Sequence, residues 1–231
     1  MTFLPIIDLR VIKILQTLTE SIWNMSPPDG LFNKIVINNL FPDLTEASKR
    51  ELIRRSLKHE EIIRLKPGLY CLSEKYRSSN PHPFVVAGMM LSPSYISMES
   101  SLWHYGLIPE ALYQTSSGIA LRTREYKNKL GVFSYYKIVC NNLKSGVKSV
   151  KIGNRWAFIA TPLRSIADMV YLNRIISWET HGINYLTESL RIDLDLLSEI
   201  PLENYNEIYD NFTNKRVKNY LLGVKKVFKN V

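Results

Sequence analysis

The chain has few cysteines and no long hydrophobic run, and each absence excludes a class of protein. Only Cys71 and Cys140 occur among 231 residues, which excludes a disulfide framework, and we expect both thiols to stay reduced. No run of about 20 consecutive apolar residues occurs, so no membrane-spanning helix is expected. The first residues, MTFLPIIDLRVIKIL, include Asp8 and no small-residue cleavage site, unlike a signal peptide. These features predict a cytoplasmic protein with no membrane partner.

Recognisable catalytic signatures are also lacking. The four histidines are scattered without metal-ligand spacing, and neither a Walker loop nor a G-x-S-x-G elbow occurs. We therefore expect no enzyme activity, no cofactor and no metal ion. Glu99, His104 and Asp168 are the only polar residues that suggest an active site, and such residues on apolar helices are more often hydrogen-bonded core groups.

Acidic residues are outnumbered, because 30 basic and 21 acidic side chains give a net charge of +9. A soluble protein this basic often binds a polyanion. The charge is uneven: residues 120–155 hold nine bases and one acid, residues 179–210 one base and eight acids, and residues 211–231 six bases and no acid. The acidic segment can instead neutralise a basic face within the fold or across a dimer, and both interpretations stay open.

The first 80 residues have the pattern of three helices followed by a hairpin. Apolar residues recur at helical spacing over residues 8–24, and residues 31–40 fit a second, short helix. Thr45 is a suitable cap for a third helix over residues 45–61. Two β-type runs follow within residues 62–72, joined by a Pro-Gly turn signal. This order is that of a winged helix-turn-helix, whose third helix enters the DNA major groove.

The predicted third helix has a cationic face. Arg50, Arg54 and Lys58 are four apart, whereas Ile53 and Leu57 face the core. We expect the early residues of this helix to lie near base edges, its arginines to contact phosphates or guanine, and the hairpin to reach an adjacent phosphate or the minor groove. The candidate DNA-binding residues are Thr45, Ser48, Lys49, Arg50, Arg54, Arg55, Lys58, Arg64 and Lys66. A solvated surface helix, or a winged helix that binds protein, remains an alternative.

A linker signal at residues 78–83, with small polar residues and two prolines, separates this domain from the rest. We predict a winged helix-turn-helix domain over residues 1–80 and an α+β regulatory domain over residues 81–231. Residues 112–139 alternate as β-strands, which predicts a small antiparallel sheet within a mixed α/β domain. Helices are predicted over residues 83–91, 162–173, 183–199 and 203–212.

The second domain has a candidate second basic face that DNA, RNA or protein can bind. Its residues are Arg122, Arg124, Lys127, Lys129, Lys148 and Lys151. Aromatic residues are interleaved with them, and they suit stacking on single-stranded nucleic acid or, as is commoner in strands, core packing. These aromatic residues are Tyr126, Tyr135, Tyr136 and Trp156. The last helix has an apolar stripe that we expect to pack on its own core or on a partner's helix.

Three blocks of sequence together resemble a known family. They are LIRRSLKHEEIIRLKPGLYCLS, PSYISMESSLWHYGLIPE and TPLRSIADMVYL, in that order. The order resembles that of AbiEi-type antitoxins, the regulators of type IV (AbiE) toxin–antitoxin operons, over roughly residues 8–175. One departure is Met98, which stands where these proteins often have histidine before Glu99.

The resemblance implies a DNA-binding transcriptional repressor that is also an antitoxin. Its winged helix would bind inverted repeats in double-stranded DNA of its own promoter, as a dimer or as cooperatively bound monomers. Its second domain would counteract a nucleotidyltransferase-like toxin without a stable complex. The alternative function is a nucleic-acid-processing enzyme, such as a nuclease that the winged helix targets to DNA. A basic segment outside the first domain favours both over a purely protein-binding module.

Overall fold

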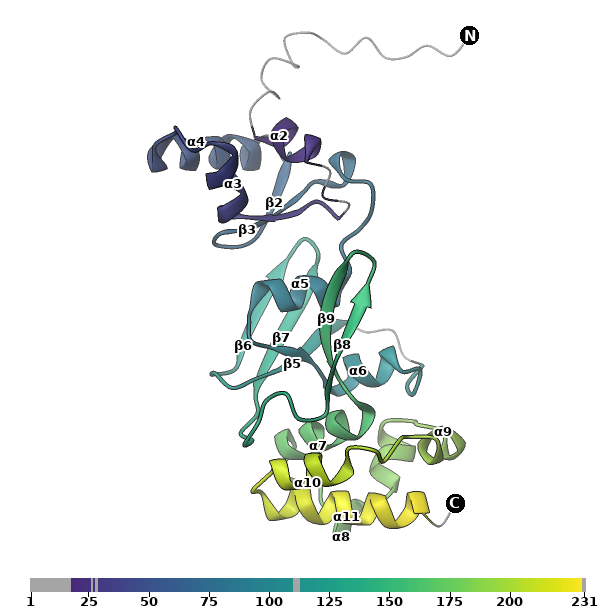
Figure 1. Ribbon diagram of the computed structural model, residues 1–231. Helices are drawn as coiled ribbons and strands as arrows, with labels where there is room; N and C mark the ends of the chain where they lie inside the picture. The colour runs from purple at the N-terminus through teal and green to yellow at the C-terminus, as the bar shows by residue number, and fades with distance from the viewer. Residues whose placement is uncertain (1–17, 26, 28, 110–112, 230–231) are drawn as a thin grey trace, which may run out of the picture. The chain divides into compact units, whose positions relative to one another are not determined.

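The protein has a mixed α+β fold in the computed structural model (Figure 1). The described residues are 18–25, 27, 29–109 and 113–229. Contacts divide the chain into two compact units, each described by itself below. The N-terminal unit holds the described residues up to His82 together with 128–130, and the C-terminal unit holds 83–127 and the residues from 131 onward.

The N-terminal unit consists of short helices and one three-stranded sheet. Most of the helix expected over residues 8–24 lies outside the described residues, and its last part is helix α2. The strands have the order β1-β3-β2, and both neighbouring pairs are antiparallel. The elements are α2 (Thr19–Asn24), β1 (Leu31–Asn33), α3 (Lys34–Leu40), α4 (Glu46–Lys58), β2 (Ile62–Lys66), β3 (Leu69–Leu72) and η1 (Glu74–Tyr76).

The expected second helix, over residues 31–40, is wrong at its start. Leu31–Asn33 forms strand β1, in which Leu31 pairs with Cys71 of β3. The Asn33 side chain then caps α3 by accepting a hydrogen bond of 3.1 Å from the Val36 backbone N–H. A short apolar run fits either a strand or a helix, and here pairing with a distant strand decides between them.

One apolar core holds the N-terminal unit together and fixes the position of α4. Ile53 of α4 is buried with residues from the other elements of the unit. The β2–β3 hairpin turns at Gly68, whose φ of 81° suits glycine in a Pro-Gly turn, so the expected hairpin is confirmed. The buried residues of this core are Leu18, Ile22, Phe32, Ile37, Ile53, Ile62, Tyr70 and Leu72.

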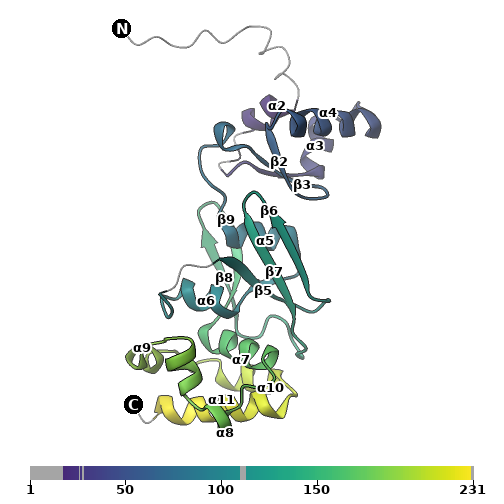
Figure 2. The same ribbon diagram turned by 180° about the vertical axis from the view of Figure 1, so that it is seen from behind.

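The C-terminal unit contains a six-stranded sheet with the strand order β6-β7-β5-β4-β9-β8 (Figures 1 and 2). Strands β6 and β8 are therefore its two edges. The strands are β4 (Tyr95–Ile96), β5 (Gln114–Ile119), β6 (Arg124–Asn128), β7 (Gly131–Lys137), β8 (Val147–Ile152) and β9 (Arg155–Ala160).

This sheet is mixed, and the expectation of a small antiparallel sheet is wrong. Strands β5 and β7 pair in parallel, as do β4 and β9, whereas β4–β5 and β8–β9 are antiparallel. The chain leaves β5, forms β6 at the outer edge and returns as β7 beside β5. The alternation of apolar residues indicates which face of a sheet a residue occupies, but it is the same in parallel and antiparallel strands. The alternation therefore could not predict the direction or the order of these strands.

Helices cover this sheet on one face and at one end. The backbone carbonyl of Ala87 in α5 accepts a hydrogen bond of 2.8 Å from the Tyr135 hydroxyl of β7, which places α5 across one face (Figures 1 and 2). The later helices gather at one end of the sheet. The helices are α5 (Pro83–Met90), α6 (Met98–His104), α7 (Pro162–Leu172), α8 (Trp178–His181), the π-helix η2 (Tyr185–Ser189), α9 (Leu194–Ser198), α10 (Tyr205–Asn211) and α11 (Lys215–Lys229).

The single helix expected over residues 183–199 is broken. The chain forms a π-helical turn and then α9, separated by Arg191 with a φ of 54°. Asp193 begins α9 by accepting a hydrogen bond of 3.0 Å from the Asp195 backbone N–H. The apolar periodicity correctly indicated helical structure, but Asp193 caps a new helix inside the segment, so the segment is not one continuous helix.

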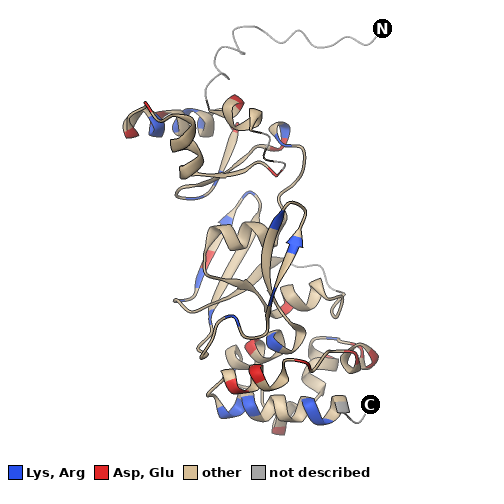
Figure 3. Cartoon of the chain, in the orientation of Figure 1, with Lys and Arg blue, Asp and Glu red and all other residues tan. Residues whose placement is uncertain are grey.

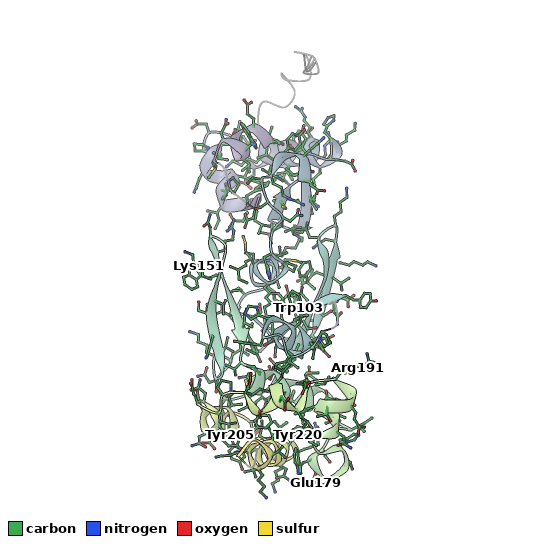
Figure 4. The ribbon with its side chains drawn as sticks, turned by 90° about the vertical axis from the view of Figure 1, so that its right-hand side faces the viewer. Trp103, Lys151, Glu179, Arg191, Tyr205 and Tyr220 are labelled. Atoms are coloured by element: carbon green, nitrogen blue, oxygen red, sulfur yellow. The ribbon has the colours of Figure 1, made fainter. Side chains whose placement is uncertain are left out.

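Helix α11 packs on its own unit, as the apolar stripe predicted. Val217, Tyr220, Leu221 and Val224 are all fully buried there. The Tyr220 hydroxyl donates a hydrogen bond of 2.8 Å to the Gly182 carbonyl, and Figure 4 shows its side chain in the helical end of the unit. None of the helices in the described part of the chain has the length and apolar character needed to cross a bilayer.

Candidate nucleic-acid interface

Helix α4 begins at a well-formed cap. The Thr45 hydroxyl accepts a hydrogen bond of 3.1 Å from the Ser48 backbone N–H, and the two hydroxyl oxygens are 2.9 Å apart. The Glu46 carboxylate forms an ion pair of 2.7 Å with Lys34 of α3, which ties the starts of the two helices together. Thr45 and Ser48 are exposed, so the N-terminal turn of α4 is open to a ligand.

The outer side of α4 carries four exposed basic residues, Arg50, Arg54, Arg55 and Lys58, which we call the α4 cationic face. The Arg50 Nε donates a hydrogen bond of 3.2 Å to the Glu46 carbonyl. Ile53 of the same helix is buried, whereas these four basic residues are exposed, so the helix presents this face to solvent.

Glu51 organises part of the α4 cationic face. Its carboxylate accepts two hydrogen bonds of 2.7 Å from Arg54 and one of 3.0 Å from Arg55. These hydrogen bonds lower the pKa of Glu51 to about 2, so it stays ionised at neutral pH. The carboxylate therefore orients both guanidinium groups and also offsets part of their charge.

Lys49 does not lie where the sequence predicted. It was expected near base edges, but its side chain is buried and its Nζ is 3.8 Å from a Glu46 oxygen. The physical reason is helical geometry: Lys49 is four residues before the buried Ile53 and shares its face. Of the three residues expected near base edges, only Thr45 and Ser48 are exposed.

The β2–β3 hairpin adds two further basic residues to the unit. Arg64 is exposed, and its guanidinium carbon is 6.0 Å from the centre of the Tyr70 ring. Lys66 is half-buried just before the turn. An aromatic ring holds a cation in place without neutralising its charge, so Arg64 can still attract a phosphate.

The candidate second basic face does not form one surface. All six of its residues are exposed, but β6 and β8 are opposite edges of the sheet. Five interstrand spacings separate the two edges, about 24 Å. Arg122, Arg124 and Lys127 belong with the β6 edge, Lys148 and Lys151 lie on β8, and Figure 3 shows basic residues on both edge strands. Lys129 is in the β6–β7 turn.

The interleaved aromatic residues divide between core and surface. Tyr135 is fully buried, and the Tyr126 ring packs edge-on against it at 5.8 Å between centroids. Tyr136 is half-buried and accepts a hydrogen bond of 3.3 Å from Gln114. Trp156, by contrast, is 60% exposed. Only Trp156 of this set is therefore placed mainly in solvent.

A buried polar cluster joins α7 to the sheet, and Asp168 is a hydrogen-bonded core group in it, whereas its partner Arg164 was not singled out in the sequence. Arg164 and Asp168 are both fully buried, and Arg164 Nε donates a hydrogen bond of 3.0 Å to Asp168 Oδ1. The hydroxyls of Tyr95 and Ser97 donate to Asp168 Oδ2 at 2.8 and 2.7 Å. Asp168 thus accepts hydrogen bonds from three donors, which accounts for the burial of its carboxylate.

Glu99 and His104, the other residues considered for catalysis, have different surroundings from Asp168. His104 packs against the Phe84 ring at 5.9 Å between centroids, and burial lowers the pKa of its imidazole. Glu99 lines a cavity of about 540 Å³, together with Gln114 and Tyr185 among other residues. Among the residues that the structure describes, no three His, Cys, Asp or Glu side chains are placed to hold a metal ion.

No protein-family model and no curated protein matches this chain.

Proposed function

We propose that the N-terminal unit is a winged helix-turn-helix that binds double-stranded DNA, with α4 as its recognition helix. The observation that carries the proposal is α4 itself: the buried Ile53 anchors the helix in the core, and the four residues of the α4 cationic face are exposed. The antiparallel β2–β3 hairpin follows α4 in the chain, and in this proposal it acts as the wing. The major groove is about 12 Å wide and admits such a helix.

The proposed contacts follow from position along α4. Thr45 and Ser48, at the N-terminal turn, contact base edges, and the helix dipole favours a phosphate there. Arg50 and Lys58 contact phosphates and set the orientation of the helix. Arg64 on the hairpin reaches a phosphate outside the groove that α4 occupies.

For the whole chain, we propose a transcriptional repressor that is also an antitoxin. The three sequence blocks that resemble AbiEi-type antitoxins support this role, and the basic edges of the C-terminal unit are compatible with it. In this proposal a homodimer binds inverted repeats upstream of its own gene. The C-terminal unit then counteracts a nucleotidyltransferase-like toxin without forming a stable complex.

The experiment is a fluorescence-anisotropy titration of a labelled duplex over a series of salt concentrations. The variant Arg50→Ala/Lys58→Ala should bind more weakly, and the slope of log K against log salt should fall by about 1.8, or 0.9 per lost phosphate contact. The matched control is Lys226→Ala, which removes one exposed charge from α11 in the other unit. A double variant that binds with the affinity and slope of the unchanged protein contradicts the proposed role of α4.

A further inference from the structure

The β8–β9 hairpin exposes two large aromatic rings on one face. Trp156 is 60% exposed and Phe158 is 55% exposed. The residues between and after them, Ala157 and Ile159, are buried. Because side chains alternate along a strand, β9 turns one face inward and displays both rings on the other. Paired exposed aromatic rings commonly mark a contact surface.

Strand register places a cation beside these rings. Trp156 is directly opposite Lys151 of β8, and Phe158 is opposite Ser149. Side chains at opposite positions of an antiparallel pair share one face and start about 5 Å apart. Lys151 is exposed and points away from the sheet in Figure 4. We call these four residues the hairpin patch.

The charge around the hairpin patch favours a polyanion as its ligand. The β8–β9 hairpin itself, residues 147–160, includes Lys148, Lys151 and Arg155 and no Asp or Glu. A second copy of the chain is a poor fit, because lysines on edge strand β8 would repel their counterparts. A polyanion that also offers flat aromatic groups satisfies both the charge and the exposed rings.

Spacing along β9 matches the bases of a single strand. Side chains two residues apart on one strand face are separated by about 6.6–6.8 Å, which is about twice the rise of about 3.4 Å between stacked nucleotides. Trp156 and Phe158 can therefore each stack on one of two bases that are splayed apart, with Lys151 near the phosphate between them. The bases of a duplex are stacked on each other and cannot meet the rings in this way.

We propose that the hairpin patch is a binding site for single-stranded nucleic acid, which it holds by stacking. This site lies in the C-terminal unit and does not depend on the proposed duplex binding by α4. It gives a specific role to one of the two basic edges of the sheet. Stacking is tolerant of sequence, so we expect affinity for RNA and DNA strands alike.

The test is fluorescence anisotropy with the full chain and labelled oligo(U) and oligo(dT). Trp156→Ala and Phe158→Ala should each weaken binding about fivefold or more. Trp156→Phe, which keeps an aromatic ring, should keep most of the affinity that Trp156→Ala loses. Lys151→Ala should lower the salt slope by about 0.7. The matched control is Tyr113→Ala, because Tyr113 is 99% exposed in the same unit but lies outside the hairpin.

Two further measurements separate this proposal from the proposed function. Trp156→Ala/Phe158→Ala should keep duplex affinity, and Arg50→Ala/Lys58→Ala should keep oligonucleotide affinity. The proposal is overturned by a chain that binds neither oligonucleotide, or by a Trp156→Ala/Phe158→Ala variant that binds them as tightly as the unchanged protein. It is also overturned if that variant alters only the sedimentation coefficient, since the patch is then an interface between copies.

Discussion

Removing the carboxylate of Asp168 is expected to destabilise the C-terminal unit strongly, because it leaves a buried positive charge without its counter-ion. The Arg164 guanidinium is fully buried, and its other hydrogen bonds go to the Ser145 carbonyl at 2.5 Å, the Tyr95 hydroxyl at 2.6 Å and the Cys140 sulfur at 3.5 Å. It also lies over the rings of Tyr95 and Phe212, with its Cζ 4.9 and 5.2 Å from their centroids. Neither ring replaces a full negative charge.

The magnitude follows from what Asp168→Ala leaves behind. Breaking a buried ion pair on one side costs about 3–5 kcal/mol. The hydroxyls of Tyr95 and Ser97 also lose their acceptor, at about 1 kcal/mol each. The free energy of unfolding should therefore fall by about 5–7 kcal/mol, which corresponds to a Tm lowered by about 10–28 °C for a unit of this size.

The assay is thermal unfolding followed by circular dichroism, with two comparison variants. Asp168→Asn keeps the shape of the side chain but replaces one acceptor oxygen with an NH2 donor, so it loses the charge together with one hydrogen bond and should also be strongly destabilised. Arg164→Met/Asp168→Leu replaces both partners with apolar side chains and should be less destabilised than either single variant. A Tm lowered by less than about 2 °C in Asp168→Ala would refute the argument that Arg164 depends on this carboxylate.

Three further predictions test separate parts of the structure. Gly118→Ala should lower stability by about 1–3 kcal/mol, because the new Cβ falls 2.3 Å from the Tyr95 ring, whereas Gly88→Ala meets no atom within 4 Å and should be neutral or stabilising in chemical denaturation. Glu51→Gln should tighten duplex binding and steepen its salt slope, since two arginines lose their intramolecular partner; an unchanged titration refutes this. Burial lowers the folded-state pKa of His104, so its contribution to stability is present above pH 6.5 and lost as pH falls through the folded pKa. His104→Gln should therefore lose less stability than the unchanged protein between pH 7.5 and pH 5 in urea unfolding, and equal losses would refute the claim.

Local signals in the sequence predicted those elements whose cause is local. Periodicity identified α7 and α11, and a threonine followed by an acid identified the start of α4 at Thr45. The Pro-Gly signal identified the turn at Gly68. In each case the residues that determine the structure lie within a few positions of one another.

The errors concern features that distant residues decide. Leu31 is in a strand because Cys71 lies beside it, and strand β8 (VKSVKI) was missed because an edge strand with lysines has little apolar signal. The two sets of basic residues fall on opposite edges because the strand order is not sequential. Lys49 is different: its four-residue spacing from Ile53 is visible in the sequence and points to burial, so the prediction that it lies near base edges was an avoidable error.

The most direct test of the central claim is a titration of the purified chain against the DNA upstream of its own gene, with a scrambled duplex of equal length as control. The account predicts tight binding to the upstream duplex, in two steps on an inverted repeat, and binding weaker by at least about 10³ to the scrambled duplex at the same salt concentration. Equal binding to both duplexes would contradict a sequence-reading role for α4.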